Sequence, residues 1–192
     1  MDLSTMKDAC ATTERVVAGI SGSQLGLATP CTEWDVRAVL NHLLGTLSLG
    51  TALLGGTVPA VEMVPGGLPA RDLVGDAADG SIVAAYRTRV DTVLSASGGD
   101  ALQRVHDTPL GAMPGVVLAG HTTLDILVHG WDLATATGQQ HGIDERLAEQ
   151  VLAFARQTIP EQHRGQRIGP EVAVAATAAA TDRLVGFLGR HP

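Results

Sequence analysis

The sequence has few aromatic residues, few cysteines and few basic residues, and each shortage excludes a class of protein. Aromatic residues make up 3% of the 192 residues, too few for the stacking platforms that bind single-stranded nucleic acid. Thirteen basic residues against 20 acidic ones give a net charge of -7, so the chain has no broad cationic surface for phosphate backbones or anionic lipid. We therefore expect neither nucleic acid nor a membrane as a partner.

Cysteine and long hydrophobic runs are also scarce. Cys10 and Cys31 are too few for a disulfide framework or a thiolate metal cage. No stretch approaches the roughly 18 apolar residues of a membrane span, and the N-terminus, with Asp2, has no signal-peptide core. These absences lead us to expect a cytoplasmic protein.

The residues that are present predict an all-α protein. A single domain over residues 1–192 is expected, because 192 residues that are 45% hydrophobic suffice for one core. Gly- and Pro-rich residues 56–71 should hold no regular element, and 171–174 could be a short extended piece. Gly138 should close the fourth helix, and Thr32 should cap the second with Asp35 in its first turn. Helical patterns cover about 2–20, 32–55, 73 or 79 to 96, 115–137, 144–158 and 178–188.

The fourth predicted helix carries the most informative pair of residues, Asp125 and His129. Their i,i+4 spacing places both side chains on one helix face, about 6 Å apart along the axis. The apolar residues around them indicate a mostly buried helix, where an inward carboxylate and imidazole cost several kcal/mol unless they are paired or bind a metal. A partner for this pair is therefore expected.

His42 is the expected partner, because it lies among apolar residues in the second predicted helix. Two histidines and one carboxylate leave open coordination positions, as a catalytic metal site needs. His121 competes for the same role, but it lies two turns, about 12 Å, from His129, so the two cannot hold one ion together. The spacing alone also allows an interpretation without a metal. In it, His42 is a hydrogen-bonded core histidine, and Asp125 and His129 form an ion pair within their helix.

Other polar and aromatic residues have local interpretations beside functional ones. Trp34 and Trp131 could wall a ligand pocket or could simply pack between helices. Asp132 and Asn41 could orient metal ligands, although local hydrogen bonding is the simpler interpretation. The remaining histidines fall in loops or at the terminus and are expected to face solvent: His106, His141, His163 and His191.

Three ordered motifs, at residues 29–45, 128–138 and 182–190, make the chain recognisable. They include Thr29-Pro-Cys-Thr-Glu-Trp34-Asp35, Val128-His129-Gly-Trp131-Asp132 and Asp182-Arg183-Leu-Val-Gly-Phe. In this order they resemble the short proteins related to the N-terminal domain of mycothiol-dependent maleylpyruvate isomerase, within the DinB-like metalloprotein superfamily. The likeness covers nearly the whole chain.

The resemblance implies a DinB-like four-helix bundle, here with a short extra C-terminal helix, and a divalent metal. The ligand positions of the family match His42, Asp125 and His129 of this chain. The ion is usually zinc, and Ni²⁺, Co²⁺ or Fe²⁺ would also suit the ligands. The family pattern usually has Glu at the position of Asp125, so the shorter side chain must reach the ion from a closer helix or through water.

The resemblance implies a small-molecule substrate and favours a metal-dependent S-transferase that uses mycothiol as cosubstrate. The isomerase has an additional C-terminal domain for which 192 residues leave no room, so we expect a substrate other than maleylpyruvate. One alternative is a thiol-independent, metal-dependent hydrolase, isomerase or cyclase of a specialised metabolite. Another is a non-catalytic metal- or metabolite-binding protein, perhaps a homodimer, and an iron oxygenase ranks last because ligand type alone favours it.

Overall fold

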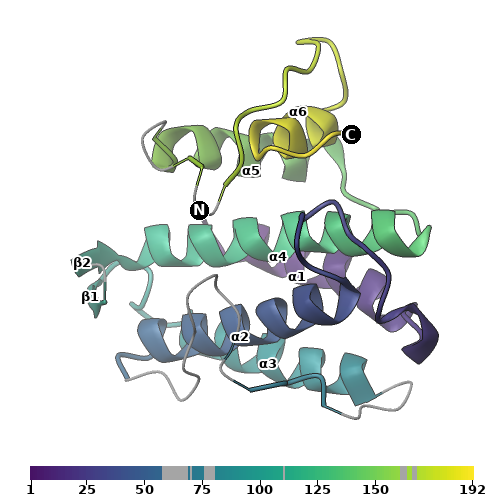
Figure 1. Ribbon diagram of the computed structural model, residues 1–192. Coiled ribbons are helices and arrows are strands. Elements are labelled where there is room, and N and C mark those ends of the chain that lie inside the picture. Colours follow the sequence, from purple (N-terminus) through teal and green to yellow (C-terminus); the bar gives the residue numbers. More distant parts are fainter. Residues whose placement is uncertain (58–68, 70, 76–80, 110, 161–163, 166–167) are drawn as a thin grey trace. The chain divides into compact units, whose positions relative to one another are not determined.

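The computed structural model describes residues 1–57, 69, 71–75, 81–109, 111–160, 164–165 and 168–192 (Figure 1). Most of the predicted loop at 56–71 lies outside this part. The described elements are α1 (Leu3–Ala18), the 3₁₀ helix η1 (Gly22–Gln24), α2 (Val36–Leu54), α3 (Ser81–Ala96), β1 (Val105–Thr108), β2 (Gly111–Pro114), α4 (Gly115–Thr137), α5 (Glu145–Thr158) and α6 (Ala180–Phe187).

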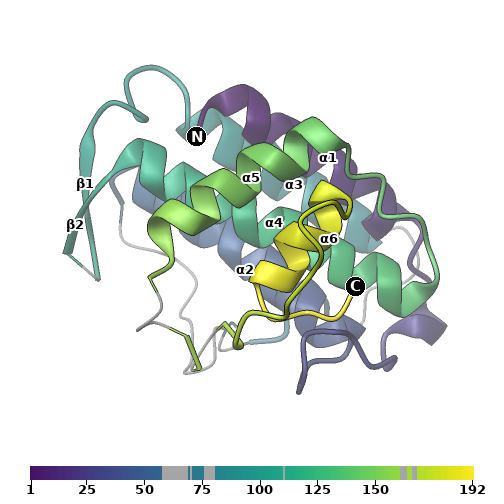
Figure 2. The same cartoon turned by 90° about the horizontal axis from the view of Figure 1, so that it is seen from above.

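The chain divides into two compact units, Met1–His141 and Gly142–Pro192. In the first unit, α1 packs against α3 and α4, and α2 packs against the same two helices, so that four helices close a bundle (Figures 1 and 2). The second unit consists of α5 packed against α6. The predicted all-α class is confirmed, whereas a single domain over residues 1–192 stays a prediction.

The core of the bundle comes from the apolar faces that the helical spacing predicts. Fully buried side chains include Met6 of α1, Leu43 of α2, Tyr86 of α3 and Ile126 of α4. Each such side chain contributes about 1.5–3 kcal/mol when it is removed from water. Tyr86 also donates its hydroxyl to the backbone oxygen of Cys10 at 3.2 Å, which ties α3 to α1.

Side-chain caps fix where the helices begin. Asp2, Asp35 and Asp144 each accept a hydrogen bond at 2.8 Å from a backbone N–H of the first turn. The predicted cap at Thr32 is therefore wrong: α2 begins at Val36 and Asp35 is its N-cap. Gly138 closes α4 in the left-handed conformation, with φ 70°, as predicted.

The sequence patterns did not predict the hairpin of β1 and β2. The two strands pair antiparallel from Val105 opposite Pro114 to Thr108 opposite Gly111. His106 on β1 was expected to face solvent, but it is 6% exposed and its Nε2 lies 2.7 Å from the backbone oxygen of Ala101. A backbone partner explains why a histidine is tolerated inside.

In the second unit, the stretch expected to be extended at 171–174 forms no strand, although Val172 donates its N–H to the backbone oxygen of Gly186 at 2.9 Å. Glu145 accepts a hydrogen bond at 3.0 Å from the backbone of Ala180, and Arg183 pairs with Glu149, so α5 and α6 are joined by polar contacts.

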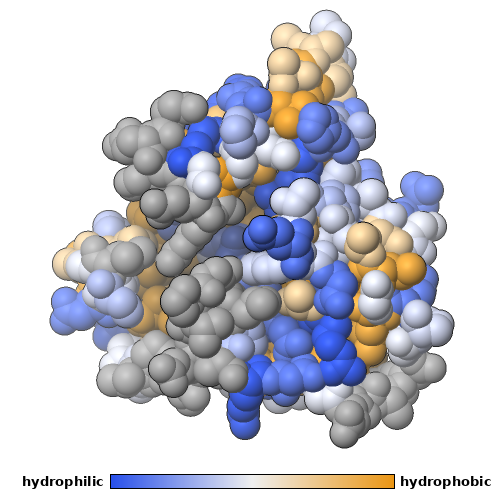
Figure 3. All heavy atoms as spheres, in the orientation of Figure 1, coloured by the Kyte–Doolittle hydropathy of each residue, from blue (hydrophilic) through white to orange (hydrophobic). Residues whose placement is uncertain are grey.

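Two surface properties bear on partners. Among the described helices, none is both long enough and apolar enough to cross a membrane. On the face drawn in Figure 3, the coloured hydrophobic residues form separate groups between hydrophilic ones. The most exposed large hydrophobic side chain among the described residues is Val105, at 66%. A homodimer stays a prediction.

Candidate metal centre

Helices α2 and α4 bring His42, Asp125 and His129 together. One ligand atom from each residue lies within 4.8 Å of the other two, and His42 Nε2 is 3.3 Å from Asp125 Oδ2. The helices approach closely where α2 carries Gly50: a Cβ there would lie 3.0 Å from Thr122 Oγ1 of α4. The three residues expected to converge are therefore neighbours in the bundle.

The two histidines and the carboxylate differ in exposure. The His42 and His129 side chains are 11% and 9% exposed, whereas the Asp125 side chain is 44% exposed. The imidazoles thus belong to the interior of the first unit, and the carboxylate is only partly buried. A small molecule could reach the group from the side of Asp125.

The electrostatics of the group suit cation binding. Desolvation alone would raise the pKa of Asp125, but the hydrogen bond and charge of His42, with His129 and His121, lower it to about 2. Desolvation lowers the pKa of His129, and its hydrogen bond to Asp132 only partly offsets this. An ionised carboxylate beside a neutral imidazole is the state in which both are metal ligands.

Thr46 belongs to the site, although the sequence analysis did not single it out. It lies one turn after His42 on α2, is 8% exposed, and its Oγ1 is 3.3 Å from His42 Nε2. The same hydroxyl donates to Asp125 Oδ2 at 3.4 Å. The i,i+4 spacing from His42 is the signal that could have identified it.

Asp132 makes a local hydrogen bond, and its partner is a candidate metal ligand. The Asp132 side chain is fully buried, and Oδ2 lies 2.9 Å from His129 Nδ1. A second group that could hold a metal consists of Cys31, His129 and Asp132, again with one ligand atom from each residue within 4.8 Å of the others. His129 is common to both groups.

Trp34 covers the two histidines from the 28–35 loop, the segment that precedes α2. Its ring centroid lies 4.8 Å from that of His42 and 5.7 Å from that of His129. Thr29 holds the loop by donating its hydroxyl to the backbone oxygen of Trp34 at 2.8 Å, and Glu33 adopts a left-handed φ of 77°. Trp34 is thus a wall of the candidate site, while Trp131, 6% exposed, lies in α4 outside this ring cluster as far as the described residues show.

The donor set fits a divalent ion. Two atoms bonded to one tetrahedral zinc at about 2.1 Å lie about 3.4 Å apart. The distance of 3.3 Å between His42 Nε2 and Asp125 Oδ2 is close to this value, so those two atoms need little movement to share an ion. Two imidazole nitrogens and a carboxylate oxygen are also the donors found in open zinc sites.

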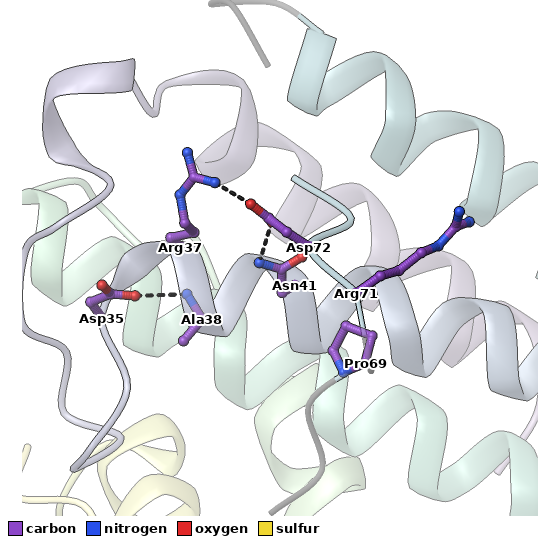
Figure 4. Close-up of a pocket in the computed structure, with 7 residues that line it drawn as sticks. All are labelled: Asp35, Arg37, Ala38, Asn41, Pro69, Arg71 and Asp72. Carbon is purple, nitrogen blue, oxygen red and sulfur yellow. Dashed lines mark hydrogen bonds and ion pairs between the residues drawn. The ribbon is translucent and has the colours of Figure 1, made fainter. Parts of the chain in front are cut away.

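Asn41 and His121, the other two candidates, take no part in the three-residue group. Asn41 donates to Asp72 Oδ1 at 2.7 Å and accepts from the backbone of Val74 at 3.0 Å, which ties the 71–75 segment to α2. It lines a pocket with Asp72, Arg37, Arg71 and others (Figure 4). His121 is partly buried one turn before Asp125, and burial lowers its pKa although the Asp125 charge opposes this.

The family model for the mycothiol maleylpyruvate isomerase N-terminal domain matches residues 6–134, which include α2 and all three candidate ligands. The chain belongs to this family. The predicted resemblance is confirmed.

Relatives and solved structures extend this result. Two uncharacterised proteins, from two strains of Mycobacterium tuberculosis, are each 34% identical over 180 residues, covering 91% of this chain and 90% of theirs. Crystal structures of mycothiol-dependent maleylpyruvate isomerase and of its histidine-to-alanine mutant share the fold, with TM-scores of 0.61 and 0.62 at 14% and 15% identity. The match covers 79% of this chain and 66% of each isomerase chain.

Proposed function

We propose that this chain is a divalent-metal-dependent enzyme that uses a low-molecular-weight thiol of the mycothiol type to act on a small electrophile. The observation that supports this best is the convergence of His42, Asp125 and His129 within 4.8 Å. It occurs in a chain of a family named after a mycothiol-dependent enzyme.

His42, Asp125 and His129 would hold the ion, with zinc as the first choice and Ni²⁺, Co²⁺ or Fe²⁺ as alternatives. When bound, the cation would lower the pKa of a thiol that it contacts and so favour the thiolate, which is the nucleophilic form.

The surrounding residues have distinct tasks in this proposal. Thr46 donates to Asp125 and so restricts the carboxylate to one orientation. The Trp34 ring lies over both imidazoles and keeps bulk water from that side. The exposed side of Asp125 leaves the approach through which a thiol and an electrophile enter.

In the transfer reaction, the thiol sulfur forms a bond to an electrophilic carbon. The leaving group departs with the electrons of its former bond, and the thiol proton passes to solvent. A thiol-dependent isomerase, which returns the thiol unchanged, is the second candidate, because two solved structures that share this fold are of a mycothiol-dependent isomerase.

Zinc-loaded protein incubated with mycothiol and a panel of aryl halides, epoxides and unsaturated diacids tests the proposal, with products identified by mass spectrometry. We expect turnover that needs both thiol and metal, and a loss of at least about 100-fold in His42→Ala. His191→Ala, which removes an exposed histidine of the second unit, is the matched control and should behave as wild type.

The same experiment separates the alternatives. Unchanged turnover in His42→Ala would contradict the proposal. Turnover without thiol would replace it by a thiol-independent hydrolase, isomerase or cyclase. Retention of metal without turnover across the panel would replace it by a binding protein.

A further inference from the structure

Asp132 is a buried carboxylate whose position in α4 does not follow from the needs of the helix. Its side chain is 0% exposed, and such a group costs several kcal/mol unless it is paired and hydrogen-bonded. It lies five residues before the last residue of α4, Thr137, and Gly138 caps that end. A negative charge in the C-terminal half of a helix opposes the helix dipole.

One partner of Asp132 is His129, one turn earlier on the same helix. Asp132 Oδ2 lies 2.9 Å from His129 Nδ1, and both side chains are in the interior. When Asp132 is ionised, its carboxylate can only accept a hydrogen bond, and Nδ1 of His129 then carries the proton and donates it. The lone pair of the imidazole is then on Nε2.

We propose that Asp132 is the positioning residue of the candidate metal centre: by accepting the Nδ1 proton of His129, it fixes the ring orientation and leaves Nε2 as the nitrogen that binds the ion with His42 and Asp125. The inference rests on the metal centre of the proposed function. Carboxylates bonded to ligating histidines serve this purpose in other metal sites, where their loss costs roughly 10–100-fold in metal affinity.

Cys31 provides the competing arrangement, because its sulfur, a His129 nitrogen and an Asp132 oxygen form the second group within 4.8 Å. If an ion lay there, Asp132 would be a ligand and not a positioning residue. The two arrangements differ in their ligands, since His42 is needed only in the first and Cys31 only in the second.

Long-range proton–nitrogen NMR spectra of the imidazoles in the metal-free wild-type protein test the first step, with His129→Ala assigning the signal. We expect the His129 signal of the Nδ1–H tautomer. The Nε2–H tautomer would overturn the inference. This measurement does not depend on whether an Asp132 variant folds, and it needs no enzymatic activity. Its outcome is therefore separate from that of the proposed function.

Metal affinity, measured by chelator competition with Zn²⁺ and Co²⁺, tests the second step. Asp132→Asn, checked by circular dichroism for its fold, should bind roughly 10–100-fold more weakly than wild type, with an altered Co²⁺ absorption spectrum. Cys31→Ser should bind as wild type. Wild-type affinity in Asp132→Asn, or a loss in Cys31→Ser as large as that in His42→Ala, would overturn the inference.

Discussion

The thiols of Cys10 and Cys31 differ sharply in their surroundings. Cys10 is 1% exposed in α1, and burial raises its pKa to about 12, whereas Cys31 is only partly buried in the 28–35 loop. Because only an accessible thiolate reacts rapidly, we expect an aromatic disulfide reagent at pH 8 to modify one thiol in the native protein and two after denaturation. Native Cys31→Ser should release no chromophore, and rapid modification of both wild-type thiols would contradict the described burial.

Asp125 allows a second prediction about a single side chain. Asp125→Asn removes the negative charge of the carboxylate, whose Oδ2 lies 3.3 Å from His42 Nε2. The Zn²⁺ affinity should therefore fall by at least about tenfold in chelator competition. Asp125→Glu keeps the charge, and the 44% exposure of the side chain leaves room for one more methylene, so its affinity should stay within about tenfold of wild type. Equal Zn²⁺ affinities of the Asp125→Asn variant and the wild-type protein would remove Asp125 from the ligand set.

At this scale, spacing predicted which residues converge but not what surrounds them. The i,i+4 pair Asp125–His129 and an inward His42 follow from helical periodicity, and the structure brings them together. Their binding of an ion stays a prediction. Thr46 follows His42 by four residues and Asp132 follows His129 by three, so the sequence shows that each pair shares a helix face. Whether the side chains touch depends on their rotamers, which the spacing does not fix.

Among the helices, the close crossing of α1 and α4 depends on Gly130. A Cβ there would lie 2.4 Å from Thr13 Oγ1, and Thr13 cannot move freely because it is buried and donates to the Ile126 oxygen at 3.0 Å. Gly130→Ala should lower the free energy of unfolding by about 1–3 kcal/mol, despite a gain of up to about 1 kcal/mol in helix propensity.

Urea unfolding monitored by circular dichroism measures the effect. Gly26→Ala is the control, because a Cβ there meets nothing within 4 Å, and it should change stability by less than about 1 kcal/mol. An unchanged midpoint in Gly130→Ala would show that α1 and α4 can separate at no cost.

The helices were easier to predict than the hairpin. Apolar periodicity over many residues and the caps Asp144 and Gly138 located α4 and α5 to within a residue or two. Strands β1 and β2 have four residues each and burial without regular alternation, so they carry too little pattern for recognition. The wrong cap at Thr32 has a related cause, because the sequence does not show that the 28–35 loop folds back through Thr29.

For the molecule as a whole, two hydrogen-bonded aspartates predict how stability depends on pH. The hydrogen bonds from Thr5 lower the pKa of Asp2 below 3.8. Burial alone would raise the pKa of Asp72, but its hydrogen bond from Asn41 and the charge of Arg37 lower it. Lowered native pKa values mean that the unfolded chain takes up protons first. The stabilisation is therefore complete above about pH 4 to 5 and lost as pH falls through the native pKa values.

Urea unfolding of the metal-free protein between pH 2.5 and 7 measures this dependence. Stability should fall with decreasing pH below about 4, and Asp72→Asn should be less stable at pH 7 with a shallower fall. A fall in Asp72→Asn as steep as in wild type would contradict the role assigned to that carboxylate.

All three candidate ligands lie in the first unit, and the family match at residues 6–134 falls within the same unit. The single domain over residues 1–192 that length and composition indicate stays a prediction. The family match and the candidate ligands therefore lie within residues 1–141.

The most direct test of the central claim is a crystal structure of the zinc-loaded protein with anomalous diffraction data at the zinc edge. The account predicts one strong anomalous peak per chain, within about 2.0–2.2 Å of nitrogen atoms of His42 and His129 and an oxygen of Asp125. A peak bonded instead to Cys31 and Asp132, with His42 uninvolved, or no peak near these helices, would contradict it.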